Sequence, residues 1–171
     1  MTCTKVLSTL SVFLFSIVSD AALAGDQKLP MRKAGLWEMK TVMDEGNGPK
    51  DQTMKMCIDG EMERNTVDAS LEEHKKACMQ YDVKTDGGKT IVDADCTFST
   101  RRVISTTTMT GDFSTAFEIA ITSTTTSVEA KDQSVVVKRT IAQSGKYAGE
   151  SCGELKAGEA EGTDGTRMMV Q

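Results

Sequence analysis

The stretch FSTAFEIAIT, residues 113–122, decides the fold class of this chain. Its large apolar side chains, Phe113, Phe117, Ile119 and Ile121, stand on odd-numbered positions and alternate with small or polar residues. A period of two directs successive side chains to opposite faces of a β-strand, so one face meets a core and the other meets solvent. The stretch therefore predicts a strand on the surface of a half-buried sheet.

The same period of two continues in both directions along the chain. Trp37, Met39, Thr41 and Met43 share one face of a first strand, which residues 46–49 break with two glycines and a proline. Further strands are expected at 52–58, 78–85, 89–99 and 101–110, and a last strand carries Val135, Val137 and Ile141. We expect a mainly β fold, with a single antiparallel sheet of about seven strands curved into an open barrel or clam.

Two segments between the second and third strands favour helix. Residues 59–64 have the composition of one helical turn. Ser70 and Glu73 stand three residues apart in the order of a capping box, which predicts the start of another helix. We expect one or two short helices beside the sheet.

The N-terminus has the three parts of a secretory signal. Lys5 supplies a positive charge, residues 6–18 are a short apolar run, and residues 22–24 read Ala-Leu-Ala, a cleavage signal. The run is shorter than the roughly 20 apolar residues that a spanning helix needs. We therefore expect residues 1–24 to be a signal peptide, an exported periplasmic protein that begins at Gly25, and no membrane span.

The rest of the chain predicts one domain and a tail. Residues 25–153 are enough for one disulfide-braced β domain and too few for two ordinary domains. Residues 154–171 are rich in glycine and glutamate, and we expect a flexible C-terminal tail there. The formal net charge is −5 with acids and bases interspersed, so no basic patch is available for nucleic acid.

Five cysteines become four once Cys3 leaves with the signal peptide, and four allow three disulfide pairings. The turn signal Asp-Gly-Gly at 86–88 selects one of them. A three-residue loop there places Thr85 opposite Lys89, and the same register places Cys78 opposite Cys96. Opposed side chains on antiparallel strands are close enough for a disulfide, which leaves Cys57 to pair with Cys152.

The apolar pattern of this hairpin is inconsistent with a simple register. In this register both faces of the hairpin carry apolar side chains. One face has Tyr81, Val83 and Ile91, and the other has Val92, Ala94 and Cys96. Either both faces are covered, or a bulge shifts the alternation.

Several short motifs together resemble a known family. They are Gly35-Leu36-Trp37-Glu38, Met56-Cys57, Cys78 with Cys96, Gly111-Asp112, Tyr147-Ala148-Gly149 and Cys152-Gly153. The pattern is similar to the exported proteobacterial family known as domain of unknown function 3617. That resemblance implies a Gram-negative periplasmic setting and a compact, cysteine-bearing domain. It implies no activity and no functional residue.

The sequence contains no recognisable set of catalytic residues. His74 is the single histidine and lies in a charged stretch that indicates a solvated surface, and no G-x-S-x-G motif supplies a nucleophile. The pairs Asp93 with Asp95 and Glu61 with Glu63 are interpreted as solvated carboxylates. We expect no enzyme activity and no cofactor.

Methionine is unusually abundant, with eleven residues in the chain. Met39, Met43, Met54 and Met56 are expected on the inward faces of two neighbouring strands. Thioether sulfur binds Cu(I), yet methionine also fills irregular cores and lines adaptable apolar sites. The M-x-M spacing occurs once and without a histidine, so packing or an apolar pocket is favoured over copper.

A curved sheet with few aromatic side chains and many methionines is underfilled. We therefore expect a non-enzymatic binding domain for a hydrophobic small molecule or a protein partner. The expected ligand-binding residues are Trp37, Met39, Met54 and Met56, on a concave apolar surface. A methionine-rich Cu(I)-handling protein is the alternative.

Overall fold

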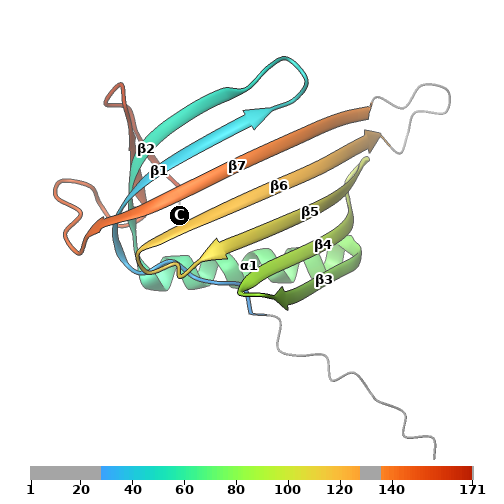
Figure 1. The fold of residues 1–171 in the computed structure, drawn as a ribbon, viewed down its shortest axis with the longest axis horizontal. Coiled ribbons are helices and arrows are strands. Elements are labelled where there is room, and N and C mark those ends of the chain that lie inside the picture. The colour runs from blue at the N-terminus through green and yellow to red at the C-terminus, as the bar shows by residue number, and fades with distance from the viewer. Residues whose placement is uncertain (1–27, 128–135, 171) are drawn as a thin grey trace, which may run out of the picture.

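A computed structural model describes residues 28–127 and 136–170 of the chain. It contains one helix and a single nine-stranded antiparallel sheet in the order β3-β4-β5-β6-β7-β1-β2-β8-β9 (Figure 1). The elements, in chain order, are β1 Gly35–Asp44, β2 Lys50–Ile58, α1 Gly60–Ala77, β3 Cys78–Asp86, β4 Lys89–Phe98, β5 Arg101–Gly111, β6 Ala116–Ser127, β7 Val136–Gly149, β8 Glu159–Gly162 and β9 Arg167–Met169. The expected mainly β fold with one antiparallel sheet is confirmed, with nine strands instead of about seven.

The sheet is open because of the route that the chain takes. After the β1–β2 hairpin, α1 carries the chain to the far edge of the sheet, about 27 Å at 1.5 Å per residue. Strands β3 to β7 then return as a meander, and β7 pairs with β1. Strands β3 and β9 are therefore the two edges, and they do not meet.

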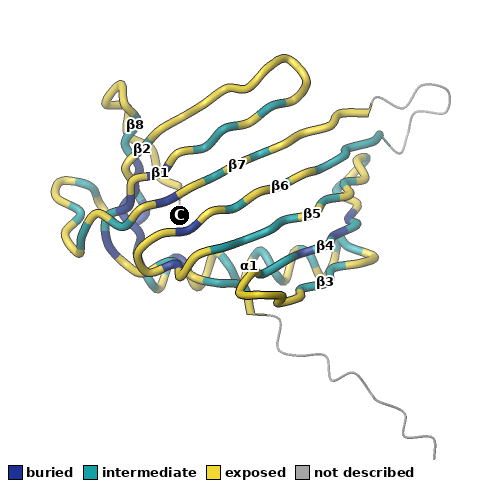
Figure 2. The backbone as a smooth tube through the Cα atoms, viewed as in Figure 1, coloured by how far each residue is buried: buried dark blue, intermediate teal, exposed yellow. Residues whose placement is uncertain are grey.

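The core gathers at one end of the inner face of the sheet, the face on which α1 packs. Buried backbone in Figure 2 concentrates at the ends of β1, β2, β6 and β7 that lie together. The core cluster consists of Trp37, Met39, Met56, Ile58, Phe113, Phe117 and Ala160. Trp37 is completely buried, and its ring centroid lies 5.4 Å from that of Phe117 and 5.5 Å from that of Tyr147. Its indole N–H donates to the carbonyl of Lys33 at 2.8 Å, so burial leaves no polar group unsatisfied.

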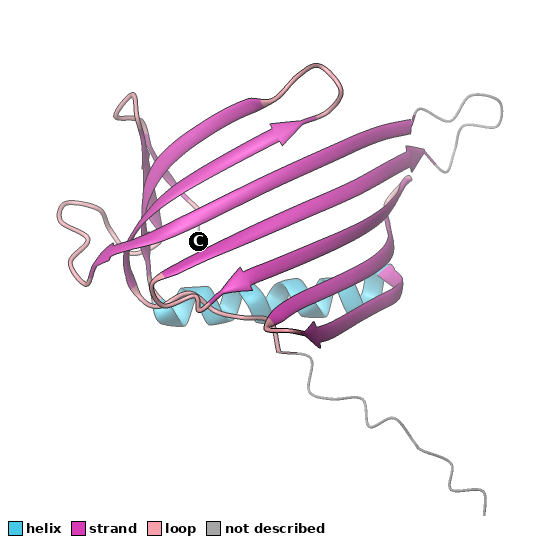
Figure 3. Ribbon diagram, viewed as in Figure 1, coloured by secondary structure: helices cyan, strands magenta, loops and turns pink. Residues whose placement is uncertain are grey.

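Of the one or two short helices that we expect, the described residues contain one, α1, which is a continuous helix of 18 residues and is therefore longer than the sequence pattern indicates (Figure 3). Asp59 caps it: its carboxylate oxygen Oδ1 accepts from the amides of Glu61 and Met62 at 3.0 and 2.9 Å. Ser70 lies inside the helix, where its hydroxyl contacts His74 Nδ1 instead of capping an amide. The helix packs on β3 and β4, and the one residue of α1 that is fully buried is the charged Glu63, so its apolar pattern in the sequence is weak.

The β3–β4 hairpin has a two-residue turn, not the predicted three-residue loop. Gly87 and Gly88 both have positive φ angles, 54° and 79°, as a type I′ turn requires, and Asp86 is paired with Lys89. A bulge between Cys78 and Gln80 shifts the register back by one residue, so Cys78 still lies opposite Cys96. The shorter turn and the bulge each shift the register by one residue, in opposite directions, so the predicted pairing of the cysteines is retained. Between the turn and the bulge, one face of the hairpin is consistently apolar and consists of Tyr81, Val83, Val92, Ala94 and Cys96.

Both predicted disulfides are present. Cys78 is bonded to Cys96 within the hairpin, and Cys57 is bonded to Cys152 across 95 residues of sequence. The second bond joins the chain after β7 to β2. It lies beside the backbone hydrogen bond from Gly158 N–H to the Cys57 carbonyl, at 2.9 Å.

The segment 154–170 is not the tail that we expected. It contains β8, which pairs with β2, and β9, which pairs with β8. Ala160 is buried opposite Met56, and a turn at Asp164, whose carboxylate accepts from the amide of Thr166 at 3.0 Å, connects the two strands. Strand pairing and the ion pairs of Arg167 with Glu154 and Glu161 therefore accompany one small buried side chain in a segment of low apolar content. The predicted signal peptide, 1–24, lies outside the described residues.

No helix among the described residues is long and apolar enough to cross a membrane.

Candidate functional site

The residues predicted to bind a ligand form the closed end of the core. Trp37, Met39 and Met56 are buried, and Met54 is partly buried against them. The structure thus brings all four side chains together, as the sequence pattern predicts. They pack against each other and against Phe117, so in this conformation Trp37 is not accessible to a bound molecule.

The inner face continues beyond this core as an in-register apolar row. Neighbouring strands pair Val83 with Val92, Thr107 with Ile121, and Ile141 with Met43, and the remaining pairings join these into one line across the sheet. In order from β3 to β1, the apolar row is Val83, Val92, Thr107, Ile121, Ile141 and Met43.

Burial decreases along the apolar row. Val92 is buried where α1 packs over β3 and β4. Ile121 and Ile141 are only partly buried, and Met43 is 36% exposed. The row therefore passes from a covered region into one that solvent reaches. We call this region the open inner face and define it by Thr107, Ile121, Ile141, Met43, Gln143 and Thr41.

Polar groups border the open inner face without interrupting it. The amide of Gln143 donates to the hydroxyl of Thr41 at 3.2 Å on the side toward the core. On the opposite side, Arg139 Nε donates to Glu45 Oε1 at 2.6 Å. Arg139 is thus held at the rim by an ion pair with Glu45 of the β1–β2 loop. The arrangement is an apolar floor with hydrogen-bonding groups at both sides.

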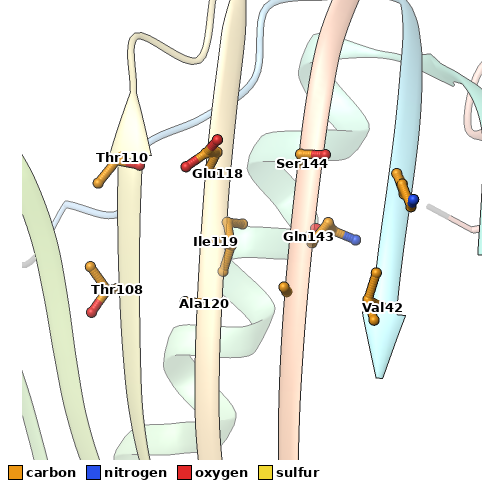
Figure 4. Close-up of a pocket in the computed structure, with 10 residues that line it drawn as sticks. Val42, Thr108, Thr110, Glu118, Ile119, Ala120, Gln143 and Ser144 are labelled. Atoms are coloured by element: carbon orange, nitrogen blue, oxygen red, sulfur yellow. The ribbon is translucent and has the colours of Figure 1, made fainter. Parts of the chain in front are cut away.

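A second candidate lies on the outer face, as a groove of about 450 Å³ (Figure 4). Ala120 and Ala142 are paired directly across β6 and β7 and form its floor. Val42 and Thr108 stand on either side of the floor, and Glu118 lines the groove near one end. The groove exists because two small side chains lie between larger ones. Since residues alternate along a strand, it is on the opposite side of the sheet from Ile121 and Ile141.

The remaining outer face carries the threonines that are abundant in residues 99–127. Thr106, Thr122 and Thr140 are in register on β5, β6 and β7, and all three are exposed. The Thr106 hydroxyl donates to the carboxylate of Asp93 at 2.8 Å. Exposed β-branched side chains suit a strand surface, so this region needs no ligand to explain it.

His74 is more buried than its charged neighbours suggested. Its ring lies 4.9 Å from the ring of Tyr81 and 6.0 Å from that of Phe98, measured between centroids. Nδ1 is 2.6 Å from the carbonyl oxygen of Ser70. The histidine therefore joins α1 to the inner face as a packing residue. Burial in the same cluster raises the pKa of the Tyr81 hydroxyl.

The acidic pairs are held by basic or hydroxyl groups. Asp95 accepts two hydrogen bonds from Arg102, at 2.8 and 2.6 Å, which lower the pKa of its carboxyl group. Asp93 lies 3.5 Å from the ammonium of Lys84. These contacts are those of a paired sheet surface, not of two carboxyl groups that share one reacting bond.

Glu63 is the residue that the sequence analysis misjudged most. The sequence pattern indicates a solvated carboxylate, but Glu63 is 4% exposed and accepts from Arg32 Nε at 2.8 Å and from Arg32 Nη2 at 2.6 Å. Arg32 Nη1 also lies 3.4 Å from the sulfur of Met56. No local pattern marks this pair, because 31 residues separate its two members.

Among the described residues, no group of three or more histidine, cysteine, aspartate or glutamate side chains is arranged to hold a metal ion. The family model described as "Protein of unknown function (DUF3617)" matches residues 32–152. The match begins at the arginine that pairs with Glu63 and ends at the cysteine bonded to Cys57. Comparisons with curated proteins and with solved structures gave no match.

Proposed function

The chain belongs to the DUF3617 family, whose description assigns no function, and from the geometry we propose a non-enzymatic binding domain for a hydrophobic small molecule. One observation carries the proposal: the apolar row leaves the cover of α1 and continues over Ile121 and Ile141, which are partly buried, to Met43, which is exposed. We place the ligand on the open inner face.

The chemistry of this surface suits an extended apolar chain. Small-molecule sites are mostly apolar with a few polar groups that fix orientation, and here Gln143, Thr41 and Arg139 border an apolar floor. The flexible side chain of Met43 can adjust to a bound molecule. The hydrogen-bonding groups at the two sides, Gln143 with Thr41 and the Arg139–Glu45 ion pair, suit a ligand that ends in a polar head group, such as a fatty acid.

The expected affinity is modest. A chain that covers ~200 Å² of this face and buries a similar area of its own gains about 10 kcal/mol at 25 cal/mol per Å². Association costs at least about 4 kcal/mol of this. The remainder corresponds to a dissociation constant of tens of micromolar, so titrations must extend well above that concentration.

Export from the cytoplasm is part of the proposal. Two disulfides persist best in an oxidising compartment, and a periplasmic domain meets lipid-derived molecules. Copper handling is less well supported than lipid binding. The Arg32 guanidinium lies 3.4 Å from the Met56 sulfur, and its positive charge opposes a cation at that thioether.

The test is a titration of detergent-free protein with a fluorescent long-chain fatty acid, together with native mass spectrometry. Ile141→Glu puts a carboxylate on the open inner face, and we expect it to weaken binding at least tenfold. Ala142→Glu is the matched control, because it changes the next residue of β7 and points into the outer groove. Trp37 emission reports folding in both variants, since Trp37 lies six residues along β1 from Met43, about 20 Å.

The two variants distinguish the two faces. Loss of binding in Ala142→Glu, with Ile141→Glu unaffected, would move the ligand to the outer groove. Absence of any bound fatty acid at several hundred micromolar would remove the small-molecule proposal and leave a protein partner as the better one.

A further inference from the structure

Strand β3 is an edge strand with an uncovered side. It pairs with β4 and with no other strand of the described chain. The two-residue turn makes Asp86 and Lys89 a hydrogen-bonded pair, and pairing alternates along an antiparallel ladder. The backbone N–H and C=O groups of Val83 and Thr85 therefore point away from β4, toward the open side. Such an edge is a template for another strand.

The regular part of β3 has defined ends and a centre. The bulge between Cys78 and Gln80 limits it on one side, and the Gly87-Gly88 turn limits it on the other. The straight segment is thus 80–86, and Val83 is its middle residue. A second copy of the same segment, running antiparallel, can use this whole length only if Val83 lies opposite Val83 of the second copy.

Charge selects the same register. Asp82 and Lys84 flank Val83 and share the outer face, where the Lys84 side chain is 62% exposed. Pairing centred on Val83 places Asp82 opposite Lys84 of the second copy, and the two-fold axis repeats this contact. Centring on Asp82 would oppose two aspartates, and centring on Lys84 would oppose two lysines. Opposite charges across a strand pair stabilise it and like charges destabilise it.

The inner face is also complementary in this register. Val83 is the β3 end of the apolar row and is paired with Val92. Placing two copies of Val83 side by side continues the row from one sheet into the other. We propose that the chain forms a two-fold homodimer by antiparallel pairing of β3 with β3 of a second copy, centred on Val83. The partner is thus a second copy of this chain, and the proposal is independent of the ligand proposed above.

Substitutions that reverse the charge at Asp82 or at Lys84 test the dimer. In Asp82→Lys, the new lysine opposes Lys84 of the second copy twice, and in Lys84→Asp, the new aspartate opposes Asp82 twice. We expect each single variant to raise the dimer dissociation constant at least tenfold in sedimentation equilibrium. The double variant restores opposite charges and should return to within about threefold of the wild type. Lys138→Asp, on a central strand, is the control and should leave the dimer unchanged.

Mixing Asp82→Lys with Lys84→Asp gives a further test. One variant has a lysine on each side of Val83 and the other has an aspartate on each side, so opposite charges face each other when the two variants pair. We expect a heterodimer from the mixture, although neither variant dimerises well alone. Hydrogen exchange identifies the surface: the amides of Val83 and Thr85 should be protected in the wild type and lose protection in Asp82→Lys. A monomeric wild type at about 200 μM by sedimentation, or a double variant as weak as the singles, would overturn the proposal.

Discussion

At the scale of single residues, the contact between Arg32 and Glu63 shows how one pair can connect distant parts of the chain. Arg32 precedes β1, and Glu63 lies in the first turn of α1. The guanidinium also reaches the sulfur of Met56 in the core. Within the described residues Glu63 is the one buried charged residue, and its ion pair with Arg32 offsets the cost of burying that charge.

We expect Glu63→Leu to lower the free energy of unfolding by about 3–5 kcal/mol, since it leaves the partly buried Arg32 charge without its partner. The double variant Arg32→Leu with Glu63→Leu should recover a large part of that loss, because two apolar side chains can replace a buried ion pair. Urea denaturation at pH 7 measures both values. Additive losses in the double variant would show that the two residues do not act as a pair.

At the scale of elements, the turn between β5 and β6 inserts an aromatic ring into the core. Phe113 has a positive φ of 56°, yet it is buried and stacks on Phe117 with ring centroids 4.9 Å apart. The carboxylate of Asp112 holds this conformation by accepting from the amides of Ser114 and Thr115 at 2.8 and 2.7 Å, and from a third amide and a hydroxyl. These bonds hold the pKa of Asp112 far below its ordinary range.

The hydrogen bonds to the Asp112 carboxylate should make the stability of the fold depend on pH. A carboxyl group whose pKa is lower in the folded than in the unfolded state stabilises the fold above its ordinary pKa of 3.8. That contribution disappears as the pH falls toward the folded-state pKa. We expect Asp112→Ala to lower the melting temperature by a few degrees at pH 7, and the difference from the wild type to shrink below about pH 4.

Thermal scans by circular dichroism between pH 7 and pH 2 measure this difference. Asp112→Asn keeps the oxygen Oδ1 as an acceptor and should lose less stability than Asp112→Ala at pH 7. A difference between Asp112→Ala and the wild type that stays constant down to pH 2 would contradict the assigned role of the charge.

The elements also show what the sequence could and could not predict. Alternation predicted β1 and β6 because their neighbours in the sheet impose one buried face. It missed β8 and β9, in which Ala160 is the one buried residue and which are held beside β2 by strand pairing and, just before them in the chain, by a disulfide. It divided α1 in two because Ser70 has a capping pattern that tertiary packing on β3 and β4 overrides.

Alternation along the strands also predicts part of the candidate site. Periodicity correctly assigned Trp37, Met39, Met54 and Met56 to one face of two strands. Which part of that face is closed depends on Phe113 and on Ala160. Alternation indicates that Phe113 is buried but places it in a strand, whereas it lies in a turn with a φ of 56°, and no local pattern marks the burial of Ala160. The open inner face lies farther along β1, at Met43, and on the neighbouring strand β7, at Ile141.

At the scale of the whole molecule, the sheet is open, and its two edge strands, β3 and β9, differ in length. The β9 edge is short, and the β3 edge has a straight segment of seven residues between a bulge and a turn. Each edge is attached by one disulfide, the β3 edge by Cys78–Cys96 and the β8–β9 end by Cys57–Cys152. The two bonds therefore stabilise a sheet that cannot gain stability by closing into a barrel.

The two disulfides should contribute unequally. On the chain-entropy model, a bond that spans 18 residues restricts the unfolded chain by about 3 kcal/mol, and one that spans 95 residues by about 4.7 kcal/mol. We expect the double variant Cys57→Ala with Cys152→Ala to lose about 1.5 kcal/mol more than Cys78→Ala with Cys96→Ala, measured by urea denaturation.

The long bond, Cys57–Cys152, also holds the chain beside β2, where the Gly158 amide donates to the Cys57 carbonyl. Its removal should therefore speed hydrogen exchange at Ala160 below the unfolding transition, while removal of the hairpin bond leaves that amide protected. Equal losses of stability, together with unchanged exchange at Ala160, would show that packing of β8 on β2 holds this end of the sheet without the disulfide.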